Sequence, residues 1–173
     1  MNGSHRSAFT LVEVIIVIAI VSILLAVLAS MVNIGEISRS RDMEKINLFR
    51  EARQIMYQIA RDVRQTTSQE ISDNGPTSSH VKFRIYSDYN ATLETPIWSG
   101  GYIEYSYDPA NQTLTRSDAN TGLTKSFNNV VTVPFNTSLL SNNKLIATIE
   151  TERPFRGSNI TSNLTTEIKI RNE

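Results

Sequence analysis

The stretch Phe9-Thr10-Leu11-Val12-Glu13 opens an apolar segment that runs to Ile34. Polar side chains interrupt the segment at five positions, Thr10, Glu13, Ser22, Ser30 and Asn33. As a helix its 26 residues span about 39 Å, and the hydrocarbon core of a bilayer is roughly 30 Å thick. The sequence therefore predicts a membrane-spanning helix over residues 9–34.

Glu13 places a carboxylate inside this apolar segment. A charged side chain at membrane depth costs about 2.5–3.5 kcal/mol on insertion scales, so such a residue usually has a partner of opposite charge. The alternative is a glutamate near the cytoplasmic end of an ordinary signal anchor, with its carboxylate reaching back to the interface. Glu13 is therefore the first candidate functional residue.

The leader ahead of the segment is eight residues long, from Met1 to Ala8. It is too short for a secretory n-region and h-region, and no small-x-small cleavage site follows the apolar core. We therefore expect the helix to remain in the mature protein.

A short polar leader, a small residue and Phe-Thr-Leu-x-Glu before a hydrophobic helix resemble the type IV pilin-like family, which includes the minor pseudopilins of type II secretion. The resemblance implies that a prepilin peptidase cuts between Ala8 and Phe9 and methylates the amine of Phe9. The family usually has glycine before the cut, so Ala8 departs from its pattern. The resemblance also implies that Glu13 meets the N-terminal amine of a neighbouring subunit in the filament.

That implied pairing is physically reasonable for Glu13, because cleavage creates an α-amine with a pKa of about 7.7–8.0, which is cationic at neutral pH. Opposite charges attract more strongly at low dielectric, and the pair sets a register between apolar helices that otherwise have little to align them.

Charge around the segment gives a conflicting signal about orientation. Arg6 is the only Lys or Arg before it, and five basic residues soon follow it, Arg39, Arg41, Lys45, Arg50 and Arg53. The positive-inside rule would put the C-terminal part in the cytoplasm. Because the leader implies a dedicated pathway and four acidic residues accompany the basic ones, we expect a single pass through the bacterial inner membrane, with the C-terminal domain outside the cytoplasm.

Composition limits what the remaining chain can do. The 173 residues carry 17 basic and 17 acidic side chains, and this balance disfavours a nucleic-acid partner without excluding it. The chain has no cysteine, so it can form no disulfide and can carry out no thiolate chemistry. About a hundred residues remain for one small domain.

Residues 35–70 predict an amphipathic helical extension, with Gly35 as the candidate site of a bend. Apolar side chains recur at spacings of three and four, at Ile46, Phe49, Ala52, Met56, Ile59 and Val63. We expect one helix from about Phe9 to Thr67 whose second half packs on a sheet. A coiled coil with another chain is the alternative.

Residues 71–173 predict a mostly antiparallel β domain, so the fold class is α+β and pilin-like. Alternating runs indicate strands at 81–87, 101–107, 112–116, 123–127, 129–134, 144–150 and 164–171. Asp108-Pro109-Ala110-Asn111 predicts a turn in which Asp108 accepts hydrogen bonds from the backbone ahead. The motif from Tyr105 to Arg116, with the helix end from Ile59 to Arg64, resembles the larger minor subunits of the J or W type. The apolar half also lacks the proline that is common in major pilins.

Catalytic and metal-binding patterns are weak. After processing His80 is the sole histidine, which disfavours a Ser-His-Asp site and zinc. Asp118 to Gly122 faintly resembles a calcium loop but lacks the later bidentate glutamate, so a plain turn is the better interpretation. Four aromatic residues, Trp98, Tyr102, Tyr105 and Tyr107, are better explained by core and cross-strand packing than by base stacking. No cofactor is expected.

Together these features predict a non-enzymatic minor subunit of a type IV pilus or type II secretion pseudopilus that helps to start or cap the fibre. Its expected partners are a prepilin peptidase, other major and minor subunits and the inner membrane. One alternative is a tip adhesin or DNA-uptake pilin. Another is a signal-anchored domain that never polymerises, in which Glu13 has no function in assembly.

Overall fold

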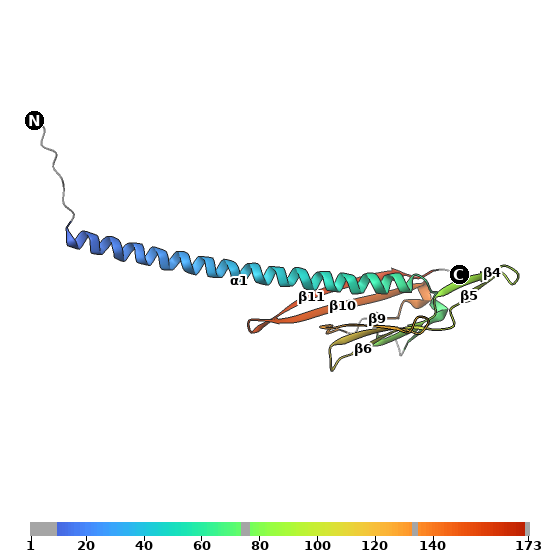
Figure 1. The fold of residues 1–173 in the computed structure, drawn as a ribbon. Helices are drawn as coiled ribbons and strands as arrows, with labels where there is room; N and C mark the ends of the chain where they lie inside the picture. The colour runs from blue at the N-terminus through green and yellow to red at the C-terminus, as the bar shows by residue number, and fades with distance from the viewer. Residues whose placement is uncertain (1–9, 74–76, 133–134, 172–173) are drawn as a thin grey trace, which may run out of the picture. The chain divides into compact units, whose positions relative to one another are not determined.

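The computed structural model describes residues 10–73, 77–132 and 135–171, and a long N-terminal helix precedes antiparallel strands (Figure 1). Helix α1 spans Leu11–Val63 and continues through Gly35 without interruption. It ends before the predicted Thr67, because the chain tightens into turns in which Gln65 N–H donates to the Asp62 carbonyl. Contacts divide the chain into two compact units, Met1–Met43 and Glu44–Glu173. The α+β prediction is confirmed.

The described strands form three antiparallel sheets. The five-stranded sheet has the order β1-β3-β6-β7-β8, with bounds Ile71–Asp73, His80–Phe83, Ile103–Asp108, Thr113–Asp118 and Leu123–Phe127. The four-stranded sheet has the order β11-β10-β9-β2, with bounds Ser158–Lys169, Lys144–Phe155, Phe135–Asn136 and Thr77–Ser78. Strands β4 (Tyr86–Asn90) and β5 (Thr95–Trp98) pair with each other. Two short 3₁₀ helices, η1 (Ser68–Glu70) and η2 (Leu140–Asn142), complete the secondary structure of the described residues.

The C-terminal part of α1 buries one face against the chain's own sheets, as predicted. Its buried residues are Leu48, Ala52, Ile55, Met56, Ile59, Asp62 and Val63. The prediction was wrong for Ile46 and Phe49, which are 47% and 38% exposed. Successive helical residues are about 100° apart, so a face centred on Leu48, Ala52 and Ile55 turns these two neighbours away from the sheets. The Phe49 ring lies instead under the Arg53 guanidinium, 4.8 Å from its centroid.

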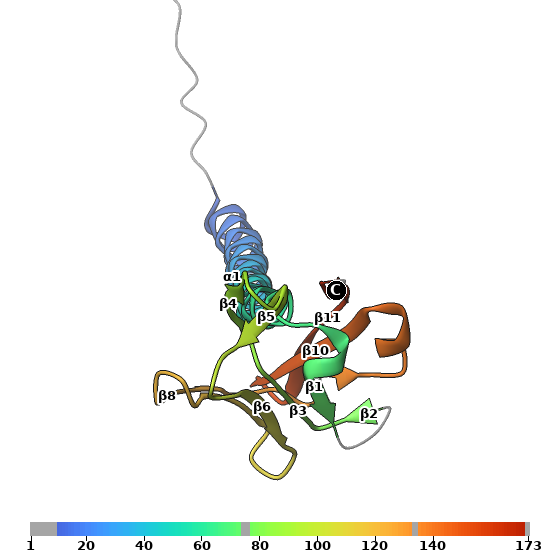
Figure 2. The ribbon, with the colours of Figure 1, turned by 90° about the vertical axis from the view of Figure 1, so that its right-hand side faces the viewer.

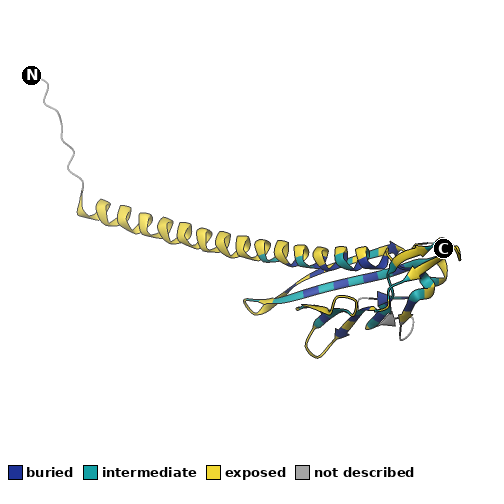
Figure 3. Ribbon diagram, turned by 45° about the vertical axis from the view of Figure 1, so that its right-hand side comes forward, coloured by how far each residue is buried: buried dark blue, intermediate teal, exposed yellow. Residues whose placement is uncertain are grey.

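Both larger sheets share one core with α1 (Figures 2 and 3). Alternate residues of β3 and β6 are buried, among them Val81, Phe83 and Tyr105, and β10 contributes Leu145 and Ile149 on the same principle. The apolar face of the helix is therefore covered within this chain, which is the packing predicted in preference to a coiled coil.

A buried carboxylate fastens the last turns of α1 to the five-stranded sheet. Asp62 is 1% exposed, and its Oδ2 accepts from the Tyr105 hydroxyl at 2.8 Å and from Arg116 Nε at 2.6 Å. Burial raises the pKa of Tyr105, and the nearby Asp62 charge raises it further, so the phenol stays protonated and donates. Burial alone would lower the pKa of Arg116, but its hydrogen bond and attraction to Asp62 raise it, so the guanidinium stays charged.

A second ion pair ties α1 to the four-stranded sheet. Arg153 of β10 donates from Nη1 to Glu44 Oε1 at 2.5 Å and from Nη2 to Glu51 Oε1 at 3.0 Å. Glu44 and Glu51 are seven residues apart, so they lie on the same side of the helix two turns from each other. One arginine thereby bridges two turns of α1.

Three hairpins, β4–β5, β6–β7 and β7–β8, have loops of the same type. Each begins with an Asn or Asp whose side-chain oxygen accepts from the backbone N–H groups two and three residues ahead, at 2.9–3.4 Å; the three residues are Asn90, Asp108 and Asp118. The residue four positions after this Asn or Asp has a positive φ, which is 52° at Glu94, 49° at Gln112 and 71° at Gly122. The predicted turn at Asp108 is confirmed. The loop at Asp118 uses its carboxylate oxygen for its own backbone, which is the plain turn that we favoured.

The strand predictions were wrong between Val81 and Trp98. The predicted strand 81–87 is two elements, because β3 ends at Phe83 and β4 starts a separate hairpin with β5.

The predicted strand 129–134 is absent from the described residues 129–132, where Val130 makes only a single bridge to Thr151. Asn129, with φ at 62°, interrupts the extended backbone there, and residues 133 and 134 lie outside the described residues.

The last two predicted strands were too short. Strands β10 and β11 pair over twelve residues each and are joined by Arg156-Gly157, whose φ angles of 46° and 83° suit a tight two-residue hairpin. Pro154 is tolerated in β10 because β9 covers the other edge of the strand only at Ile146 and Ala147.

Replacing Arg116 should destabilise the fold strongly. Arg116→Ala leaves the Asp62 carboxylate buried without its closest cation, which we expect to cost about 3–5 kcal/mol of unfolding free energy. Arg61→Ala is the matched control, because Arg61 contacts the same carboxylate at 3.4 Å but its side chain is 54% exposed, so its loss should cost less than about 1 kcal/mol. Urea unfolding of the full chain in nanodiscs, followed by near-UV circular dichroism, measures both. Equal small losses would contradict the assignment.

Replacing Gln112 should stabilise the fold. Gln112 occupies the left-handed region at 49°, which costs a side-chain-bearing residue about 1–2 kcal/mol, partly offset by the greater entropy that glycine loses on folding. We therefore expect Gln112→Gly to raise the unfolding free energy by about 0.5–1 kcal/mol. Gln112→Ala keeps a Cβ and should give no such gain in the same urea titration. A gain from both variants would show that the φ angle is not the cause.

Candidate assembly helix and processing site

The N-terminal part of α1 is an apolar surface that no other described residue covers. Among the described residues α1 is the one helix long and apolar enough to cross a membrane, judged by length and composition. Every residue from Leu11 to Ile34 is exposed (Figure 3). An apolar surface of this extent requires lipid or other protein chains around it.

The serines within this part satisfy their own hydrogen bonds. The hydroxyl of Ser22 donates to the Ile18 carbonyl at 2.8 Å, and that of Ser30 donates to the Ala26 carbonyl at 3.0 Å. Both are bonds to the residue four positions earlier, which is the usual way for serine to lie in a helix. Neither hydroxyl therefore presents an unpaired donor to lipid.

Glu13 lies in the first turn of α1 with an exposed side chain. Its backbone N–H donates to the Thr10 side-chain oxygen at 3.3 Å, so Thr10 caps the helix. Thr10 was not predicted as a cap, although threonine followed three residues later by glutamate is the spacing of a capping box. The turn also places the carboxylate at the positive end of the helix dipole. Ala8 and Phe9, the other predicted site residues, lie outside the described residues.

Residues 3–29 match the family model for the prokaryotic N-terminal methylation motif. The chain carries a type IV pilin-like N-terminus. No curated protein and no solved structure matches the chain. The motif implies processing by a prepilin peptidase and assembly with other pilin subunits, and with the exposed apolar helix it fits a membrane-anchored pilin. Pilin-like proteins with this motif are structural rather than enzymatic.

The other residues considered for chemistry have structural contacts. His80 Nε2 lies 2.9 Å from Glu104 Oε1 on the neighbouring strand. Tyr105 and Tyr107 are buried, which confirms the core interpretation for these two. Tyr102 is 38% exposed, with Lys82 Nζ 4.2 Å from its ring centroid. The described residues contain no group of three histidine or acidic side chains placed to hold a metal ion.

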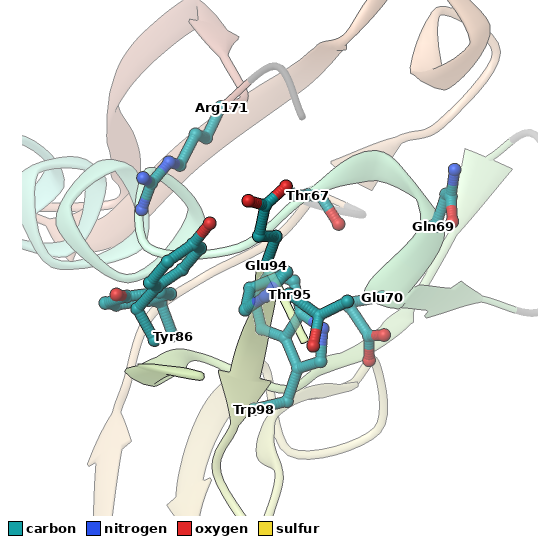
Figure 4. A pocket seen from close by; sticks show the side chains of 10 residues that line it. Thr67, Gln69, Glu70, Tyr86, Glu94, Thr95, Trp98 and Arg171 are labelled. Carbon is teal, nitrogen blue, oxygen red and sulfur yellow. The ribbon is translucent and has the colours of Figure 1, made fainter. Parts of the chain in front are cut away.

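A pocket of about 520 Å³ is a feature of this domain that sequence reasoning missed. It is lined by the β4–β5 hairpin, by residues 67–70 and by Arg171 (Figure 4). The hairpin was not predicted, and Arg171 comes from the far end of the chain, so no local pattern places these residues together.

Proposed function

We propose that this chain is a minor structural subunit of a type IV pilus or type II secretion pseudopilus, and that it helps to start or cap the fibre. The carrying observation is an uncovered apolar helix with a carboxylate in its first turn. In this proposal the leader at residues 1–8 is removed, 9–34 is the membrane and assembly helix, 35–70 is its extension, and 71–173 is a β-rich domain outside the cytoplasm.

The peptidase cuts between Ala8 and Phe9 and methylates the new amine of Phe9. That amine is cationic and lies four residues before Glu13, so on a neighbouring subunit it reaches a similar membrane depth. Pairing the two charges relieves the cost of each in lipid and sets the stagger between helices whose apolar surfaces alone would slide. Assembly thus rests on helix packing along 11–34 and on this one ion pair.

The β6–β7 hairpin supports assignment to the larger minor subunits. The motif from Tyr105 to Arg116 and the helix end from Ile59 to Arg64 are separate stretches of sequence that resemble such subunits. Asp62, Tyr105 and Arg116 from these two stretches meet in one buried network. The resemblance is therefore carried by residues that act as a unit in the fold.

Processing should depend on a prepilin peptidase. We expect the protein recovered from native membranes to begin at methylated Phe9, because the cut removes residues 1–8 and creates the amine that Glu13 needs. Intact mass and N-terminal sequencing, with and without the peptidase, measure this. An intact Met1 in the presence of the peptidase, or a cut elsewhere, contradicts the proposal.

Neutralising Glu13 should abolish incorporation into the fibre while leaving membrane insertion and folding intact. Glu13→Gln is the sharpest variant, because glutamine keeps the size of the side chain and removes only the charge, and the cap bond from the backbone N–H of residue 13 to Thr10 is unaffected. Glu36→Ala is the matched control, an exposed acidic residue of α1 beyond the apolar segment. Sheared-fibre fractions and membrane fractions are compared by immunoblotting. Normal incorporation of Glu13→Gln would favour a signal-anchored domain that does not polymerise.

A further inference from the structure

The pocket beside the β4–β5 hairpin has the dimensions of a small-molecule site. Its volume of about 520 Å³ lies within the range of roughly 300–1,000 Å³ that is usual for ligand pockets. All its lining residues belong to the unit Glu44–Glu173, so the pocket belongs to the folded domain. Neither the membrane helix nor the pilin-like motif contributes to it.

Aromatic rings form one wall of the pocket. Tyr86 and Trp98 are paired edge to face across the hairpin, with ring centroids 6.4 Å apart and planes at 88°. Tyr89, also a lining residue, is 51% exposed. Tyr86 and Trp98 are half-buried, so each ring keeps part of its flat apolar surface open to the cavity, and a ligand can stack there.

The polar side chains of the pocket balance in charge. The Arg171 guanidinium lies 4.9 Å from the Tyr86 ring centroid, and Figure 4 shows the Glu94 carboxylate turned toward the side where these two lie. The other acidic lining residue, Glu70, is neutralised by Arg84 Nε at 2.6 Å. A phosphate or another strongly charged ligand would meet no excess of opposite charge, which favours a neutral ligand.

The backbone conformation of Glu94 is strained. It has a φ of 52° at the loop position that glycine occupies in the β7–β8 hairpin. A non-glycine residue in this region is strained, and such strain gathers at functional sites. Here the strained residue supplies one of the two carboxylates of the pocket, and the other, that of Glu70, is paired with Arg84.

We propose that this pocket binds a neutral carbohydrate. A sugar ring has an apolar C–H face that can stack on Tyr86 or Trp98. It also has hydroxyl groups that both donate and accept hydrogen bonds. Arg171 supplies only donors and Glu94 only acceptors, so together they match a pair of hydroxyls with charge-assisted hydrogen bonds. This site goes beyond the filament function and does not depend on it.

Trp98 reports directly on this site, because it is the only tryptophan in the chain. The full chain is placed in nanodiscs, which avoids detergents with sugar headgroups. Lactose and N,N′-diacetylchitobiose are titrated separately while Trp98 emission is recorded. We expect at least one of them to give a saturable change with a dissociation constant of about 1 mM or tighter. No saturable change with either up to about 100 mM overturns the proposal.

Glu94→Gly and Gln112→Gly form a matched pair of variants, because each relieves a positive φ at the same position of a hairpin loop. Both should fold, and only Glu94→Gly should weaken sugar binding, by about tenfold or more. Equal affinity in the two variants overturns the placement of the sugar. Sialyllactose, as an anion, and trilysine, as a cation, are titrated alongside, and a response to either of these alone overturns the neutral-ligand assignment.

Discussion

The carboxylate of Asp62 is the contact on which the β domain depends. It lies at the end of α1, where Tyr105 and Arg116 both donate to one of its oxygens. Hydrophobic burial alone would let the helix slide or rotate on the sheet, since apolar contact has little directionality. The hydrogen bonds to Asp62 select one rotation and one register. The Arg153 bridge to Glu44 and Glu51 makes a second such contact on the other large sheet.

Three carboxylates of this chain lie in three different environments, and each is matched with a different cation. Asp62 is buried and finds Arg116 in its own fold. Glu13 is on an uncovered apolar helix, and its proposed partner belongs to another subunit. Glu94 is at a pocket whose opposite charge is Arg171. A buried charge must be paired inside the fold, whereas exposed ones are free to serve recognition.

Periodicity predicted the helix better than the strands. The apolar run after Phe9 and the later three-and-four spacing gave one helix with its end within a few residues of Val63. The hairpin β4–β5 was missed because its residues are mostly exposed and do not alternate. The β10–β11 hairpin was underestimated because the predicted strands ended at Glu150 and began again at Leu164, whereas the two strands pair with each other up to Phe155 and Ser158.

The sequence by itself determined the long apolar helix, the N-terminal methylation motif and the candidate status of Glu13, because each depends on residues close together in the chain. The turn at Asp108 was predictable for the same reason, since its hydrogen bonds reach only three residues ahead. Only the tertiary structure brought Asp62 to Tyr105 and Arg116, and Tyr86 to Arg171. These contacts join residues more than forty positions apart, and what brings them together is the packing of the helix and sheets on one core.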